Sequence, residues 1–260
     1  NILAAEPEQT LEFGALSVDF DSVNFSYEED EPILHDISFA LSSGQTLGLL
    51  GRTGSGKTTI TRLFFRLYDP TSGTIRLGDT DIHHVRPSQL RDHVGIVTQN
   101  VQIFQASVRD NLTFFDPTVD DERVYETLQT LGLDTWLASL PNGLDTRLDS
   151  GGQSLSAGEA QLLAFARIFL KDPGLVILDE ASSRLDPVTE QLIEHAIDRL
   201  LAGRTAIIVA HRLATVQRAD RILILQNGQV IEEGDRIALV ADTDSHFSQL
   251  LRTGMEQVLA

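Results

Sequence analysis

The octapeptide Gly51–Thr58 reads G-R-T-G-S-G-K-T and fits the pattern G-x-x-x-x-G-K-[ST]. A short apolar run, Thr46–Leu50, precedes it, and the residues from Lys57 to Leu67 have the pattern of a helix. Glycines let the backbone curl so that successive N–H groups point at an anion, and the N-terminus of the following helix faces the same anion. The order strand, loop, helix therefore predicts a phosphate-binding loop in an α/β fold.

The residue types of this loop suit a nucleotide with a magnesium ion. Lys57 supplies a positive charge for the β- and γ-phosphates, and the hydroxyl of Thr58 is a magnesium ligand. We expect the loop and the first helical residues to bind the nucleotide together: Gly51, Arg52, Thr53, Gly54, Ser55, Gly56, Lys57, Thr58 and Thr59.

A second apolar run, Leu175–Leu178, is typical of a parallel strand that is buried on both faces. Two carboxylates, Asp179 and Glu180, follow it directly. In a protein with a phosphate loop, an Asp at the end of such a strand holds Mg²⁺. The adjacent Glu180 could orient and deprotonate the attacking water, so the pair predicts hydrolysis rather than binding alone.

Composition excludes several other classes of function. The chain has 260 residues, 38 acidic and 20 basic side chains and a formal net charge of −18, which argues against a nucleic-acid partner. It has no cysteine, which removes disulfides, thiolate catalysis and Cys-ligated zinc. No apolar stretch approaches the 18 or so residues that a membrane span needs.

The remaining pattern places the two motifs in a mixed fold. We expect further strands and helices in these ranges: strands near 18–25, 33–41, 94–98, 206–210, 222–225 and 230–232, and helices within 106–171 and at 187–201. Asn227-Gly228 is a strong hairpin signal between the last two strands. The predicted fold is α/β: a parallel-sheet P-loop NTPase core, a helical subdomain and an antiparallel β subdomain that comes mainly from the N-terminal third. His83, His84 and His93 fit no site, and we expect them on the surface.

The segment Leu155–Gln161 reads L-S-A-G-E-A-Q, and an apolar helix from Leu162 to Leu170 follows it. Here the chain resembles the nucleotide-binding domain of ATP-binding cassette (ABC) transporters of the exporter type, whose signature is L-S-G-G-Q. The resemblance covers residues 17 to about 250, with the motifs in family order. It implies an ATPase that binds Mg²⁺ and ATP and dimerises head to tail to power transport across a membrane.

The resemblance also implies a role for single residues. Tyr27 matches the aromatic residue that stacks on adenine, Gln99 the glutamine that touches Mg²⁺ and the attacking water, and His211 the histidine that contacts the γ-phosphate. The expected catalytic residues are then Glu180, His211 and Gln99, and the expected magnesium ligands are Thr58, Gln99 and Asp179. The signature residues that would meet the ATP of a partner domain are Ser156, Ala157, Gly158 and Glu159.

The same resemblance gives a domain plan. Residues 1–16 are expected to be a linker remnant from an upstream membrane domain, and residues 17–260 the ATPase domain, with a helical subdomain at about 100–170. The region Gln99–Phe115 would receive the transmembrane domains. The ATPase domain itself would then lie at the cytoplasmic face of the cell membrane, although the sequence does not reveal the transported substrate.

Several positions depart from the family pattern. Ala157 and Glu159 replace a Gly and the Gln of the signature, Arg184 replaces a small residue of the D-loop, and Thr146–Ser150 lacks the glutamate of the T-x-V-G-E motif. Glu159 would put a negative charge near ATP unless it points away. Together these departures favour a member of a heterodimer whose signature serves the weaker site. The alternative is a homodimer in which the signature has drifted harmlessly.

Two other functions stay open from the sequence. One is a soluble ABC-type ATPase that does not transport, and the acidity and the single phosphate loop oppose it. The other is a regulatory module that holds ATP without turnover. Glu180 and His211 argue against that module, whereas the altered signature argues mildly for it.

Overall fold

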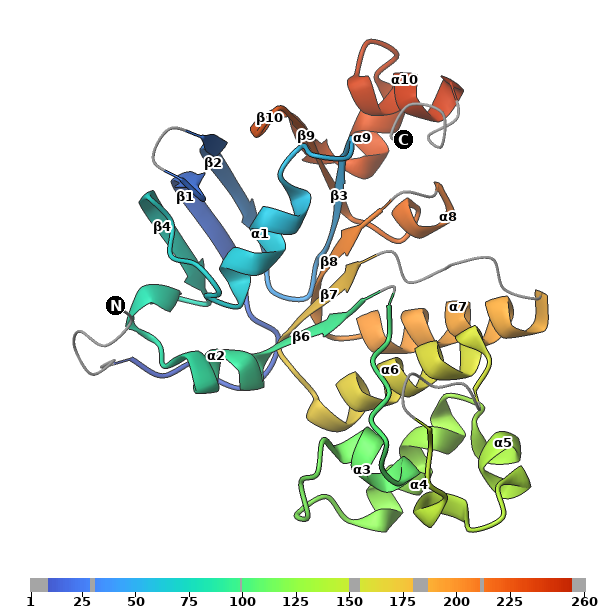
Figure 1. The fold of residues 1–260 in the computed structure, drawn as a ribbon. Coiled ribbons are helices and arrows are strands. Elements are labelled where there is room, and N and C mark those ends of the chain that lie inside the picture. Colours follow the sequence, from blue (N-terminus) through green and yellow to red (C-terminus); the bar gives the residue numbers. More distant parts are fainter. Residues whose placement is uncertain are drawn as a thin grey trace. The chain divides into compact units, whose positions relative to one another are not determined.

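A computed structural model describes residues 9–28, 31–98, 100–149, 155–179, 187–210 and 213–253 (Figure 1). The chain divides into two compact units. The first contains residues 1–95, 173–178 and 203–260, and the second contains residues 96–172 and 179–202. None of the helices in the described ranges is both long enough and apolar enough to cross a membrane.

A six-stranded sheet with the order β10-β9-β3-β8-β7-β6 carries the phosphate loop. Its strands have these bounds: β3 Thr46–Gly51, β6 Val94–Val97, β7 Leu175–Asp179, β8 Thr205–Val209, β9 Arg221–Gln226 and β10 Gln229–Asp235. Strand β3 pairs in parallel with β8 on one side and with β9 on the other. Every residue of β3 is buried, as expected of a parallel strand with both faces covered.

The first unit also holds a four-stranded sheet with the order β2-β1-β4-β5 and antiparallel pairing. Its strands are β1 Val18–Ser26, β2 Pro32–Leu41, β4 Ser72–Leu77 and β5 Thr80–Asp81. Helix α1, Lys57–Phe64, is drawn beside this sheet (Figure 1). It contacts the sheet through Phe64, whose ring centroid lies 5.2 Å from that of Phe20 in β1. Burial of such large aromatic side chains fixes the helix that follows the phosphate loop.

Besides α1, four short helices complete the part of the first unit that the structure describes, together with a short 3₁₀ turn at Ile82–His84. They are α2 Pro87–His93, α8 Leu213–Val216, α9 Arg236–Ala241 and α10 His246–Thr253. A two-residue turn at Asn227 and Gly228 joins β9 to β10, with φ of 49° and 74°. Positive φ at both positions is the geometry of the tight hairpin that the Asn-Gly pair predicts.

The second unit is helical. Its helices are α3 Val108–Thr113, α4 Asp121–Thr130, α5 Asp134–Ser139, α6 Ala157–Lys171 and α7 Pro187–Leu201, with a 3₁₀ turn at Gly143–Asp145. Helix α6 is its centre, because α3, α4 and α7 all pack against it. Its apolar residues Leu163, Phe165 and Ala166 are fully buried. A helix that other helices surround in this way needs apolar side chains on most of its surface.

The structure confirms the predicted α/β fold class with a parallel sheet, an antiparallel sheet and helices. Some local expectations were wrong. Helix α1 ends at Phe64 instead of Leu67 because Arg66 adopts a φ of 46° and its guanidinium donates hydrogen bonds to the carbonyls of Ile82, His83 and Val85. These bonds require the chain to leave the helix.

His93 was also placed wrongly. We expected it on the surface, but its side chain is 4% exposed. Its Nδ1 lies 2.9 Å from the carbonyl oxygen of Gln89, and its ring contacts that of Phe13. Tertiary packing decides this, because nothing in the neighbouring sequence marks His93 as a core residue. The division into a linker at 1–16 and an ATPase domain at 17–260 stays a prediction.

Candidate functional site

The phosphate loop depends on glycines that no other residue could replace without strain. Gly51, Gly54 and Gly56 have φ of 150°, 82° and 107°. A Cβ atom on Gly51 would lie 2.4 Å from the carbonyl oxygen of Leu225, and one on Gly56 would lie 2.6 Å from Leu34 Cδ2. The loop is therefore curled in the way predicted, and its packing against neighbouring chain segments enforces that curl.

The side chains of the loop concentrate positive charge and hydrogen-bonding groups in a small volume. Lys57 is 6% exposed, and its Nζ donates to the carbonyl oxygens of Gly51, at 2.5 Å, and Arg52, at 3.0 Å. Ser55 Oγ is buried and has no hydrogen-bond partner among the described residues. Arg52, Thr53 and Thr58 are exposed. The loop thus holds a buried cation and an unsatisfied hydroxyl, and both suit an anionic ligand.

Helix α1 begins without a cap of its own. Gly56 is the N-cap residue and makes no side-chain cap hydrogen bond, and the first turn contains no acidic side chain. The first N–H groups of a helix have no partner within the helix and carry a partial positive charge. An anion at this position would satisfy them, so the structure fits a phosphate group at the start of α1.

The β9–β10 hairpin supports this loop from a distant part of the sequence. The N–H of Gly228 donates to Ser55 O at 3.2 Å, and the carbonyl of Gly228 accepts from His35 N at 2.8 Å. A Cβ on Gly228 would lie 2.1 Å from Ile33 O. The turn glycine is therefore needed for close approach as well as for its positive φ.

Tyr27, the residue expected to stack on adenine, lies beside helix α1. Its hydroxyl is 3.3 Å from Thr59 Oγ1 and accepts a hydrogen bond of 2.9 Å from Arg62. Its ring contacts those of Phe25 and Tyr68, and its side chain remains 40% exposed. Thr59, in contrast, is buried and contributes its hydroxyl to Tyr27.

The remaining catalytic predictions fall where the structure gives no description. Gln99, Glu180 and His211 lie outside the described residues, as does Arg184. Asp179 is described as the last residue of β7 and is partly exposed, as expected of a carboxylate at the end of a buried strand. The roles of these residues stay predictions.

The signature residues form the start of helix α6 in the second unit. Ser156 is its N-cap: Ser156 Oγ accepts from the N–H of Glu159 at 3.2 Å, and the Glu159 carboxylate accepts from the N–H of Ser156 at 2.7 Å. This is a capping box. Ala157 is exposed and Gly158 is buried. The carboxylate of Glu159 therefore points back to the N-terminus of its own helix, where it accepts a hydrogen bond from Ser156.

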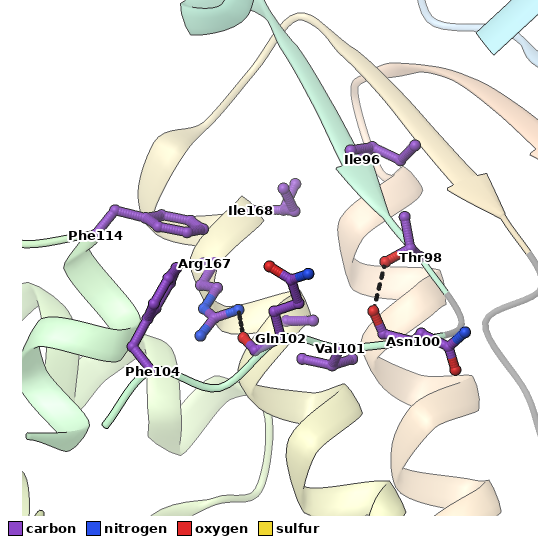
Figure 2. A pocket seen from close by; sticks show the side chains of 10 residues that line it. Ile96, Thr98, Asn100, Val101, Gln102, Phe104, Phe114, Arg167 and Ile168 are labelled. Atoms are coloured by element: carbon purple, nitrogen blue, oxygen red, sulfur yellow. Dashed lines mark hydrogen bonds between the residues drawn. The ribbon is translucent and has the colours of Figure 1, made fainter. Parts of the chain in front are cut away.

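The second unit also contains a cavity of about 280 Å³ (Figure 2). The residues that line it come from the end of β6 and the segment after it, from the C-cap of α3 and from helix α6: Ile96, Thr98, Asn100, Val101, Gln102, Phe104, Phe114, Ala164, Arg167 and Ile168. Most of the lining is apolar, and Phe104 and Phe114 are large exposed aromatics, at 38% and 56%. Half of the lining, from Asn100 to Phe114, belongs to the Gln99–Phe115 region that we expected to receive transmembrane domains, and most of the rest comes from α6.

Among the described residues that line the cavity, only Arg167 is charged, and its side chain has several partners. It donates to Asn111 O at 2.7 Å and to Gln102 O at 2.8 Å, and its guanidinium carbon lies 4.9 Å from the centre of the Phe114 ring. Burial lowers the pKa of Arg167 to about 10, so the group stays charged at neutral pH. Arg167 thereby ties helix α6 to both edges of the cavity.

The altered segment Thr146–Ser150 is described as far as Asp149. It runs beside the start of α3: Arg147 pairs with Ser107 in an isolated bridge, the N–H of Val108 donates to Thr146 O, and the N–H of Leu148 donates to Ala106 O. These backbone bonds depend on no particular side chain, so they tolerate the missing glutamate.

Two arginines, Arg62 and Arg167, make contacts that were not predicted from the sequence. Arg62 lies three residues after Thr59 on α1, and residues at this spacing share a helix face, which could have linked it to Thr59. Arg167 is a charge inside the apolar run Leu162–Leu170, and a charged residue in such a run signals a buried, hydrogen-bonded cation. No local signal could have identified their partners.

Comparisons with known proteins agree on the family. The family model described as "ABC transporter" matches residues 34–183. An uncharacterised ABC transporter ATP-binding protein of Bacillus subtilis, YknV, is 43% identical over 86% of this chain and 37% of its own length. Human ATP-binding cassette sub-family B member 6 is 40% identical over 89% of this chain and 27% of its own length.

A solved structure extends the agreement to the fold. The structure of a bacterial Atm1-family ABC exporter with ATP bound superposes with a TM-score of 0.86 at 35% identity, over 96% of this chain and 43% of that one. This chain belongs to the ABC transporter family, and its homologues are ATP-binding proteins that include exporters. It spans less than half the length of these relatives.

Proposed function

We propose that this chain binds and hydrolyses ATP with Mg²⁺ as the motor domain of an ABC exporter. The observation that carries the proposal is the phosphate loop, where the uncapped start of α1 adjoins the buried Lys57. A glycine cradle, a buried ammonium group and a helix N-terminus without a side-chain cap together match the charge and size of a polyphosphate.

Each part of the loop would have a separate task. The backbone N–H groups from Gly54 to Thr58 would bind phosphate oxygens, and Lys57 would exchange its bonds to Gly51 O and Arg52 O for bonds to the β- and γ-phosphates. The exposed Thr58 hydroxyl would hold Mg²⁺, with Asp179 and Gln99 as the other predicted ligands. Bound ATP supplies the phosphoanhydride bond that is cleaved, and Mg²⁺ supplies charge neutralisation at the phosphates.

Hydrolysis would need a second nucleotide-binding domain, packed head to tail. Ser156 and Gly158 of one domain would then approach the γ-phosphate held by the other, and closure would exclude water from the site. Glu180 would polarise the attacking water, while His211 and Gln99 would position it. The partner is a second copy or a related chain, and the variant signature favours a related chain.

The cavity beside Phe104 and Arg167 is where we place the transmembrane partner. Its lining is apolar with exposed aromatic rims, which suits a short amphipathic segment. This assignment would put the ATPase domain at the cytoplasmic face of a membrane. One relative, a probable multidrug resistance ABC transporter ATP-binding/permease protein of Bacillus subtilis, has a name that joins both functions, which supports a transmembrane partner.

The first experiment compares ATP binding and hydrolysis by the wild-type chain with those of Lys57→Ala. We expect the loss of the ammonium group to weaken binding by at least about tenfold, since a hydrogen bond to a charged group contributes about 1.5–3 kcal/mol. The chain's other lysine, Lys171, lies at the end of α6 and provides the matched control, Lys171→Ala. Equal binding by wild type and Lys57→Ala would contradict the proposal.

The second experiment uses Glu180→Gln. We expect turnover to fall by about two to four orders of magnitude while ATP binding is retained, and light scattering with and without Mg²⁺ and ATP then reports dimer formation. A dimer formed with ATP would identify a working L-S-A-G-E signature and a homodimer. A persistent monomer that binds ATP would point to a different partner chain. Wild-type binding without any turnover, even with a partner, would favour the regulatory module.

A further inference from the structure

We propose that Arg62 is a positioning residue for the nucleobase, which acts by holding the Tyr27 ring in place as a stacking surface. The inference rests on the proposed function, because it assumes that Tyr27 stacks on the base of a bound nucleotide. It adds a residue that neither the sequence motifs nor the phosphate loop identify. All of its contacts lie within the first unit.

The hydroxyl of Tyr27 is fixed from helix α1. Arg62 donates a 2.9 Å hydrogen bond to it, and Thr59 Oγ1 lies 3.3 Å away. Thr59 and Arg62 are three residues apart and therefore lie on the same face of the helix. Since α1 begins at Lys57, the element that would bind the phosphates also anchors the ring.

The ring of Tyr27 is fixed from its sides. Phe25 and Tyr68 make nearly perpendicular ring contacts with it, with centroids 4.8 and 5.0 Å away and interplanar angles of 89° and 84°. The guanidinium carbon of Arg62 lies 5.8 Å from the ring centroid, within the range of a cation–π interaction. In spite of these contacts Tyr27 remains 40% exposed, so ring surface is left for a planar ligand.

The physical gain is preorganisation. An exposed tyrosine that is free to rotate loses side-chain entropy when a base stacks on it, and that loss weakens binding. A ring that Arg62 already holds loses less. Because Arg62 is exposed and its described contacts are with Tyr27, its removal should affect the ring without disturbing the core.

The test separates the base from the phosphates. The affinity of the full 260-residue chain is measured for Mg²⁺ with ATP and for Mg²⁺ with tripolyphosphate, which has no base. For Arg62→Met we expect the dissociation constant for ATP to rise about three- to tenfold, while that for tripolyphosphate stays within about twofold of wild type. KM for ATP should rise by the same factor as the dissociation constant, with kcat nearly unchanged. Arg91→Met, an exposed arginine on α2, is the matched control and should change neither affinity.

A second variant tests the route through Tyr27. Tyr27→Phe keeps a stacking ring but removes the hydroxyl that Arg62 holds. We expect Arg62→Met to weaken ATP binding by less than about twofold in this background, because the two changes remove the same interaction. Arg62→Lys should recover part of the lost affinity, because an ammonium group can also donate to the hydroxyl.

Several outcomes would overturn the inference. An equal loss of ATP and tripolyphosphate affinity would mean that Arg62 contacts phosphate directly. An unchanged ATP affinity would mean that the contacts are structural only, and full additivity with Tyr27→Phe would mean that Arg62 does not act through Tyr27. Failure of the wild-type chain to bind either ligand is a distinct result, since it would refute the proposed function itself.

Discussion

The two helices that the family pattern links to phosphate begin in opposite ways. Helix α1 starts at Gly56 without a side-chain cap and without an acid in its first turn. Helix α6 starts at Ser156 with a complete capping box, in which Glu159 returns to the Ser156 N–H at 2.7 Å. One helix terminus is left open for an external anion, and the other is satisfied by its own carboxylate.

The start of α1 is suited to bind a ligand, whereas the start of α6 is suited to stabilise its own helix. No side chain caps the start of α1, so a bound phosphate would accept hydrogen bonds from its first N–H groups and would gain affinity from them. In α6 the capping box stabilises the unit by itself, and the negative charge of Glu159 opposes a second anion at the same helix end. We infer that the first terminus binds phosphate strongly and that the second makes a weak contribution to dimer closure.

The largest expected effect comes from a methyl group that deforms the loop leading into the open terminus of α1. Gly51→Ala puts a Cβ 2.4 Å from Leu225 O and 2.5 Å from Ser55 Oγ, so the loop must deform. We expect ATP affinity to fall by about two orders of magnitude or more, as for loss of two charged hydrogen bonds. Isothermal calorimetry measures this.

Gly54→Ala is the control for that change, since a Cβ there meets nothing within 4 Å although φ is 82°. It should cost only the strain of a left-handed alanine, about 1–2 kcal/mol. Similar affinities for the two variants would contradict the view that the packing of the loop, and not only its dihedral angles, forms the site.

The second prediction concerns the stability of helix α6, whose N-terminus is capped by its own side chains. Arg167→Met removes a buried cation and leaves the carbonyls of Gln102 and Asn111 without their donor. We expect the free energy of unfolding to fall by about 2–4 kcal/mol, measured by urea denaturation. Arg123→Met is the comparison, because Arg123 donates one hydrogen bond to Leu170 O and should cost less. If Arg167→Met left the free energy of unfolding unchanged, the buried cation would not be needed for stability.

Loss of the cap itself should be smaller. Ser156→Ala removes the oxygen that accepts from Glu159 N, and N-cap replacements of this kind cost about 0.5–2 kcal/mol. Thermal unfolding reports the loss, and the melting temperature should fall by a few degrees. Ser139→Ala serves as the control, because Ser139 only donates to Trp136 O at the end of α5. An unchanged melting temperature for Ser156→Ala would show that the capping box is not formed in solution.

The smallest expected effect, that of Glu159→Gln, tests the difference between the two helix termini most directly. Glu159→Gln keeps a side chain that can complete the capping box but removes the negative charge. In the Glu180→Gln background we expect the ATP-induced dimer to become about two- to fivefold tighter, which corresponds to the 0.3–1 kcal/mol of a charge at a helix end. Analytical ultracentrifugation at several protein concentrations measures it. A weaker dimer would mean that the partner's site uses the Glu159 charge.

The sequence by itself determined the local features of this protein. The octapeptide Gly51–Thr58, the apolar runs of β7 and β8, the helix Pro187–Leu201 and the hairpin turn at Asn227 and Gly228 all lie where residue periodicity and glycine chemistry predicted them. These features depend on backbone preferences and on side chains a few residues apart, which are visible in a single sequence. The family signature could be identified for the same reason.

The tertiary structure alone decided how these features support one another. It put Gly228 against Ser55, ended α1 through the bonds of Arg66, buried His93 and joined Arg62 to Tyr27. Each of these contacts joins residues that are separated in sequence, so its existence depends on how strands and helices are arranged and not on local pattern. Glu159 is an intermediate case. Its capping-box partner Ser156 is local in sequence, but which groups approach this end of the helix depends on the tertiary structure.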